Sequence, residues 1–226
     1  MKRLLFPLLT LFSIALATAQ SPAPAPAEKS DPAAKKILDK IRKKYEGYKT
    51  LEAAFTLTME VPGQPKDVQK GTVGQEGDKF RLDMEQQVIV SDGQATWVYQ
   101  KKNNEVQINN AEPAGSDNGF MTPKDLLNRY QKGDYLYSVV DKVTEGGKVL
   151  TQIEFKPKNK KSEYSKLRVS IDEKAGTIQS VKAFAKDGSR YNFAISRMSP
   201  NKAFGADYFT FDTKRFPNVK VEDLRM

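Results

Sequence analysis

The chain has 226 residues, a formal net charge of +9, and neither cysteine nor histidine. Without these two residue types it has no disulfides, no zinc site built from His and Cys, and no nucleophilic catalysis that needs a Cys or a His base. We therefore expect no catalytic residues, no metal and no cofactor, although a hydrolase that uses only Asp and Glu stays open.

The N-terminus has the pattern of a secretory signal peptide. Lys2 and Arg3 precede an apolar run over residues 4–17, and Ala17-Thr18-Ala19 is typical of a cleavage site. The run is shorter than a membrane-spanning helix. We expect residues 1–19 to be removed and the product to be periplasmic; an uncleaved signal anchor is the alternative.

The segment that follows predicts a tether and then one folded domain. Residues 20–30 are rich in Pro and Ala, which favours an extended linker, and residues 31–226 suit a single domain. Asp31-Pro32 is a helix start, with Asp as the cap and Pro in the first turn. Apolar residues then recur every three or four positions, which predicts an amphipathic helix of about four turns: Ala34, Ile37, Leu38, Ile41, Tyr45 and Tyr48.

After residue 50 the apolar period changes to two, which indicates strands. Tight-turn sequences such as Asp92-Gly93 and Asp187-Gly188 separate them. Strands at this spacing favour an antiparallel meander, closed or nearly closed. The expected strands cover residues 54–61, 68–75, 79–85, 87–91, 96–100, 105–109, 135–144, 149–156, 166–172, 178–185 and 190–197.

One helix interrupts the meander. Thr122 and Pro123 are a helix start, Leu126, Leu127 and Tyr130 form a short apolar stripe, and Gly133 ends it. We expect this helix to cover the end of the barrel or the mouth of a trough.

Residues 90–99 form the most specific motif of the chain, V-S-D-G-x-x-x-W-x-Y. Phe120-Met121, the strand-like Tyr208-Phe209-Thr210-Phe211 and the ending at residues 219–223 follow it in order. Over residues 33–226 this order of segments resembles the LolA family of periplasmic outer-membrane lipoprotein carriers. The resemblance implies a mainly β fold with helices: an incomplete antiparallel β-barrel of about eleven strands, covered by a lid of short helices, with an N-terminal amphipathic helix.

The resemblance also implies the partners. An inner-membrane ABC transporter would load the carrier with lipoprotein acyl chains, and an outer-membrane acceptor lipoprotein or its equivalent would receive them. We expect a monomer that binds no nucleic acid. The family commonly has an Arg-Pro pair between the positions of Val73 and Phe80, which is thought to latch the lid; this chain has neither residue there. The family's latch is therefore not carried over.

An acyl chain requires a large and adaptable apolar surface, which Leu, Phe and Met supply. Apolar alternation reports burial, so a place in the ordinary core is the alternative for each candidate. The expected acyl-binding residues are Phe55, Leu57, Met59, Phe80, Leu82, Met84, Trp97, Tyr99, Met121, Leu126 and Leu127.

Three alternatives remain open from the sequence. The scattered lysines favour ordinary solvated surfaces, with lipid headgroups or a protein partner as the other possibility. The same fold also suits binding or sensing of other lipids or glycolipids. An enzyme on a barrel scaffold is the third.

Overall fold

The computed structural model describes residues 29–111 and 123–225 of the chain. The expected signal peptide, most of the tether, and Phe120, Met121 and Thr122 lie outside these ranges. In the described part, neither helix has the length and apolar content needed to cross a membrane. The elements are α1 (Pro32–Glu46), β1 (Thr50–Glu60), β2 (Asp67–Glu76), β3 (Lys79–Met84), β4 (Gln87–Ser91), β5 (Ala95–Gln100), β6 (Glu105–Asn110), α2 (Pro123–Lys132), β7 (Tyr135–Glu145), β8 (Lys148–Pro157), β9 (Tyr164–Asp172), β10 (Thr177–Ala185), β11 (Arg190–Pro200), the 3-10 helix η1 (Thr213–Arg215) and β12 (Lys220–Asp223).

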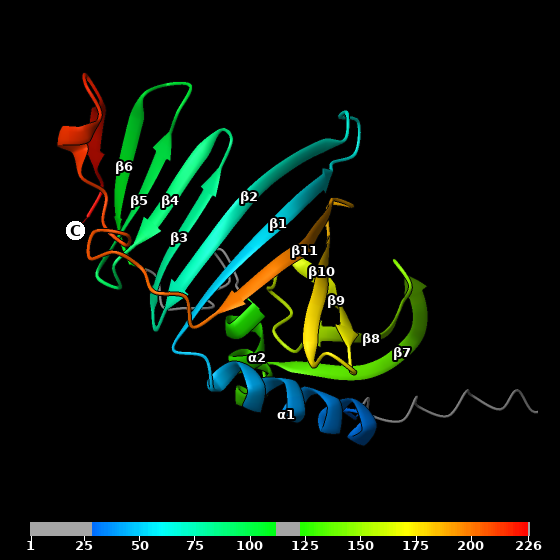
Figure 1. Ribbon diagram of the computed structural model, residues 1–226. Coiled ribbons are helices and arrows are strands. Elements are labelled where there is room, and N and C mark those ends of the chain that lie inside the picture. Colours follow the sequence, from blue (N-terminus) through cyan, green and yellow to red (C-terminus); the bar gives the residue numbers. More distant parts are fainter. Residues whose placement is uncertain (1–28, 112–122, 226) are drawn as a thin grey trace, which may run out of the picture.

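All twelve strands belong to one open, curled sheet (Figure 1). Their order is β12-β6-β5-β4-β3-β2-β1-β11-β10-β9-β8-β7, so β12 and β7 are the edges. Neighbouring strands are antiparallel except for β12, which pairs with β6 in parallel. The expected incomplete barrel is confirmed, with twelve strands rather than eleven.

The expected amphipathic helix is α1, and its cap joins it to the sheet. One carboxylate oxygen of Asp31 accepts from Ala33 N at 2.8 Å, and the other accepts from Val139 N of β7 at 3.2 Å. These two backbone hydrogen bonds lower the pKa of Asp31. The apolar stripe of the helix is buried: Ala34, Leu38, Ile41 and Tyr45.

Both helices pack on the same side of the sheet, here called the helix face; the opposite side is the outer face. Directly opposed residues of an antiparallel pair share a face, so the strand register assigns each side chain. The largest core cluster joins α1 and α2 to the helix face of β7–β10 and to Leu51 of β1. Ile195 of β11 packs against this cluster and against a second one on β1–β3. The helix face therefore carries one continuous apolar core.

The outer face of β4–β6 is covered by the C-terminal segment, coloured orange to red in Figure 1. Phe211, Phe216 and Val219 pack there against strand residues that include Val88 and Val106. The prediction of a strand over Tyr208–Phe211 is wrong, since these residues form a turn and irregular chain. Their aromatic rings lie over the sheet and pack on one another instead of alternating between its faces.

Tyr45 connects α1 to an irregular point of the sheet. The register of β10 shifts between Ile178 and Ser180, and the Ile178 amide donates to the Tyr45 hydroxyl at 3.1 Å. That hydroxyl in turn donates to Met198 Sδ at 3.4 Å. Burial raises the pKa of Tyr45 to about 12, so the hydroxyl stays protonated near neutral pH.

The substitution Tyr45→Phe should lower the free energy of unfolding by about 1–3 kcal/mol, because it leaves the buried Ile178 amide without an acceptor. Denaturant unfolding measures this. Tyr48→Phe is the control: the Tyr48 hydroxyl makes no hydrogen bond in the described part of the chain, so it should change stability by less than about 0.5 kcal/mol. Equal losses in the two variants would contradict this role of Tyr45.

Asp39 holds α2 against α1. Its Oδ1 accepts from the Tyr130 hydroxyl at 2.6 Å, and its Oδ2 accepts from Lys35 Nζ at 2.7 Å. The hydrogen bond from Lys35, followed by the one from Tyr130, lowers the pKa of Asp39 below 3.8. Since the folded pKa is below the unfolded one, the ionised carboxylate stabilises the fold above about pH 4, and this stabilisation is lost as the pH falls through the folded pKa.

Asp39→Asn should therefore be less stable than the wild type at neutral pH, with the difference shrinking as the pH falls below about 4. Unfolding free energies measured across pH test this. Asp78→Asn, at an exposed carboxylate without a hydrogen bond in the described part, is the control and should change the free energy of unfolding by less than about 0.5 kcal/mol at neutral pH. A difference for Asp39→Asn that does not shrink as the pH is lowered would show that the ionised carboxylate is not the cause.

Candidate functional site

Six of the expected acyl-binding residues lie on the helix face of β1 and β3. Phe55 of β1 is opposite Gly71 of β2, which is opposite Met84 of β3. Ala53, Val73 and Leu82 are aligned across the same three strands. Alternation along the strands places the others on this face. The six are Phe55, Leu57, Met59, Phe80, Leu82 and Met84.

The centre of this surface is a buried apolar floor. Phe55, Leu82 and Met84 are all at most 5% exposed and pack with Ala53 and Val73. Gly71 makes this packing possible: a Cβ at this position would lie 2.5 Å from the Asp83 carbonyl oxygen and 2.7 Å from Phe55 Cζ. The Phe55 ring therefore occupies the space above a glycine.

The rim of the surface is only half-buried. Leu57, Ile89 and Phe193 pack against the floor while remaining partly exposed. The Phe193 ring stacks on that of Phe55, with centroids 4.3 Å apart and planes 27° apart. We call the floor and rim together the apolar patch: Ala53, Phe55, Leu57, Val73, Leu82, Met84, Ile89 and Phe193.

Phe193 and Ile89 belong to the patch but were not among the residues predicted from the sequence. Phe193 is opposite Leu57 because β11 pairs with β1, although the two residues are far apart in the sequence. The alternation of Tyr191, Phe193 and Ile195 was the available signal, but it does not reveal the partner strand. Ile89 is opposite Leu82 and carries the patch into β4.

Leu126 and Leu127 of α2 lie on the helix face as expected, deep within the main core cluster. They are 1% and 2% exposed and belong to the same cluster as Leu38 and Ile153. Leu51, also in that cluster, shares its face of β1 with Phe55. The stripe of α2 therefore packs into the main core cluster. Met121 lies outside the described residues.

Trp97 and Tyr99 lie on the outer face, away from the other candidates. They are opposite Val90 and Val88, whereas Val98 between them is opposite Ile89 of the patch. The Tyr99 ring packs on Phe216 with centroids 4.6 Å apart. Both side chains belong to the cluster under the C-terminal segment. The structure thus gives these two residues a packing role there and does not bring them to the patch.

A family model agrees with this architecture. Residues 46–212 match the model described as outer membrane lipoprotein carrier protein LolA. The chain belongs to this family. The match includes β1–β11 and α2, and with them every residue of the apolar patch.

Individual proteins are also similar to this chain in structure or in sequence. An uncharacterized conserved protein from Thermus thermophilus superposes with a TM-score of 0.54 at 10% identity, over 84% of this chain and 99% of that one. A LolA superfamily protein from Nitrosomonas europaea gives a TM-score of 0.41 at 13% identity, over 79% of this chain and 98% of that one. An uncharacterized protein of Methanocaldococcus jannaschii is 31% identical over 90 residues, which are 40% of this chain. The match spans about a quarter (26%) of that curated relative.

Proposed function

We propose that this LolA-family protein binds the acyl chains of lipoproteins on the apolar patch and carries them from the inner to the outer membrane. The observation that supports this most is the patch itself, which grades from a buried floor to a half-exposed rim on the face that both helices share. A side chain that serves only as core is normally covered on all sides. A rim that stays half-exposed leaves apolar area for a guest.

The energy required of such a carrier is large. Keeping an acyl chain out of water is worth about 0.8 kcal/mol per CH₂, or roughly 12 kcal/mol for about sixteen carbons. A soluble shuttle must offset most of this and still release the cargo. Met84 in the floor suits this task because its flexible thioether adapts to irregular chains, and Met59 lies further along the same face of β1.

The proposal includes the compartment and the partners. Residues 1–19 would direct export to the periplasm and be cleaved, and residues 20–30 would link the cleavage site to a single carrier domain over residues 31–226. An inner-membrane ABC transporter would load the carrier, and an outer-membrane acceptor lipoprotein or its equivalent would unload it. We propose binding and transport rather than an enzymatic reaction, and a monomer as the working form.

Native mass spectrometry of the protein purified from the periplasm tests this function. A mass increase equal to a triacylated lipoprotein, lost after a detergent wash and regained on mixing with lipoprotein, is the expected result. Small lipids or glycolipids as the only bound species would overturn lipoprotein transport and favour a lipid carrier or sensor. An empty protein that hydrolyses lipid would overturn binding altogether.

A further inference from the structure

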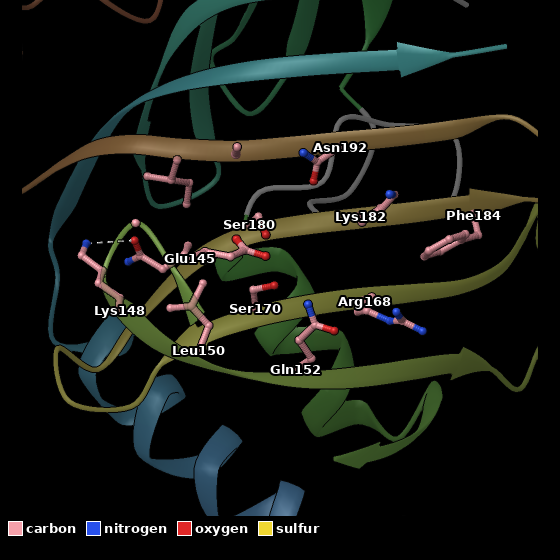
Figure 2. Close-up of a pocket in the computed structure, with 14 residues that line it drawn as sticks. Glu145, Lys148, Leu150, Gln152, Arg168, Ser170, Ser180, Lys182, Phe184 and Asn192 are labelled. Carbon is pink, nitrogen blue, oxygen red and sulfur yellow. Dashed lines mark hydrogen bonds between the residues drawn. The ribbon is translucent and has the colours of Figure 1, made fainter. Parts of the chain in front are cut away.

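A hollow lies on the outer face of β8–β11, on the side of the sheet opposite the one that carries the apolar patch. Its volume is about 500 Å³, which is within the usual range for small-molecule sites. Figure 2 shows the strands side by side with polar side chains rising from them, and the β7–β8 hairpin with Glu145 and Lys148 at one end. Most side chains that line this hollow are polar or charged, whereas those of the patch are apolar.

The floor of the hollow consists of two rows of side chains across the strands. In the first row Gln152 is opposite Ser170, which is opposite Ser180. None of these three side chains forms a hydrogen bond within the described part of the chain, and neither does Asn192. Four polar groups are therefore available to a ligand.

The second row carries an excess of positive charge. Arg168 of β9 is directly opposite Lys182 of β10, and like charges so placed repel each other. Arg168 Nη2 donates to Glu154 Oε2 at 2.9 Å, but Lys166 Nζ donates to the same oxygen at the same distance. One carboxylate thus serves two cations, and Lys182 has no ion pair among the described residues.

The other contacts of Lys182, Lys166 and Arg168 bring no further negative charge to balance them. Lys182 Nζ lies 5.6 Å from the centroid of the Phe184 ring, which Lys166 and Arg168 also approach, at 5.1 and 5.7 Å. Arg168 Nε is buried without an acceptor. At the hairpin end, Lys148 donates to Gln179 at 3.3 Å and Glu145 provides the opposite charge. The net positive charge is therefore centred on Arg168 and Lys182.

We propose that this hollow binds a phosphate ester of a hydroxyl-bearing alcohol, either free in solution or as the headgroup of an anionic glycerophospholipid. The phosphate oxygens lie against Arg168 and Lys182, where they satisfy a cross-strand pair that otherwise repels. The alcohol hydroxyls bond to Ser180, Ser170 and the amides of Gln152 and Asn192. An acyl chain does not fit here, because it would strip water from these polar groups without replacing their hydrogen bonds.

Titration of the full protein with sn-glycerol 3-phosphate, followed by amide chemical shifts and calorimetry, tests the proposal. We expect saturable shifts at Ser170 and Ser180, and Lys182→Gln should weaken binding by at least tenfold. Lys70→Gln is the matched control: it removes the same charge from the outer face of β2, where Lys70 is opposite Thr56, and should bind like the wild type. Ser180→Ala should weaken binding of glycerol phosphate while leaving that of inorganic phosphate unchanged.

Vesicles distinguish the two sources of the ligand. Sedimentation with phosphatidylglycerol vesicles but not phosphatidylcholine vesicles, lost in Lys182→Gln, assigns the ligand to a membrane headgroup. Binding of glycerol phosphate without vesicle binding assigns it to a soluble ester. Equal binding by Lys182→Gln and Lys70→Gln, no binding at millimolar concentration, or binding only of a Glu-rich peptide would each overturn the site.

Discussion

The variant Leu57→Glu should bind the acyl chain of a lipoprotein about 10- to 100-fold more weakly than the wild type, because a carboxylate within an apolar contact costs roughly 1–3 kcal/mol. Leu57 is at the rim of the apolar patch, opposite Phe193 of β11 and Gln69 of β2. A charge here interrupts the path of the chain without removing a residue of the floor. Fluorescence titration with a labelled triacylated lipopeptide measures the affinity.

Thr56→Glu is the matched control for this variant. Thr56 is the preceding residue of β1 and is also half-buried, but its side chain is on the outer face, opposite Ala194. The same carboxylate one residue away should leave the affinity for the lipopeptide unchanged. Equal weakening in both variants would show that charge on β1, rather than the face it occupies, causes the effect, and the patch would lose its proposed role. Circular dichroism should show that both variants are folded.

The strands and the first helix could be predicted from the sequence because their signals are local. Asp31-Pro32 starts α1 as predicted, and the buried stripe Ala34, Leu38, Ile41 and Tyr45 follows from a period of three to four. The strand over residues 87–91 has the predicted bounds. Turn glycines also act locally: Gly93 has a φ of +89°, and Asp92 accepts from the backbone of Gln94 and Ala95.

The face of the sheet on which each side chain lies was harder to predict than the strands themselves. It depends on pairing between strands that are far apart in the sequence. The alternation places Trp97 and Tyr99 on the face opposite to that of Val98, but it does not show which of the two faces packs against the helices. β4 is apolar on both sides, with Val88 and Val90 on the outer face and Ile89 on the helix face, and this is typical of a strand covered on both faces. The outer cover is the aromatic C-terminal segment, of which only Tyr208–Phe211 was predicted from the sequence, and that as a strand.

Only some residues of the apolar patch could be placed on one face from the sequence, for a related reason. Phe55, Leu57 and Leu82 lie on the patch because β1–β3 are successive strands whose pairing follows from short turns. Phe193 belongs to the patch only because β11 returns to pair with β1, which closes the chain on itself over more than a hundred residues. No local pattern specifies that return.

Gly71→Ala should lower the free energy of unfolding by about 1–2 kcal/mol and weaken lipopeptide binding as well. Its Cβ would lie 2.5 Å from a backbone oxygen and 2.7 Å from Phe55 Cζ, so the floor of the patch must shift. Overpacking of this kind costs about 1–3 kcal/mol, more than the roughly 0.5–1 kcal/mol that replacing a strand glycine returns. Denaturant unfolding and the lipopeptide titration measure the two effects.

Gly74→Ala tests the outer face of the sheet with the same substitution on the same strand, β2. Gly74 is three residues from Gly71, so its added Cβ points to the outer face, where it would lie 2.6 Å from Tyr208 Cε1 and 3.0 Å from Phe204 Cζ. These side chains belong to the C-terminal segment, whose displacement should shift the emission of Trp97, the single tryptophan, while lipopeptide affinity stays unchanged. Gly205→Ala, with open space around its Cβ, should leave the free energy of unfolding, the lipopeptide affinity and the Trp97 emission unchanged. Loss of lipopeptide binding in Gly74→Ala would mean that the outer face also holds cargo, because only the face distinguishes this substitution from Gly71→Ala.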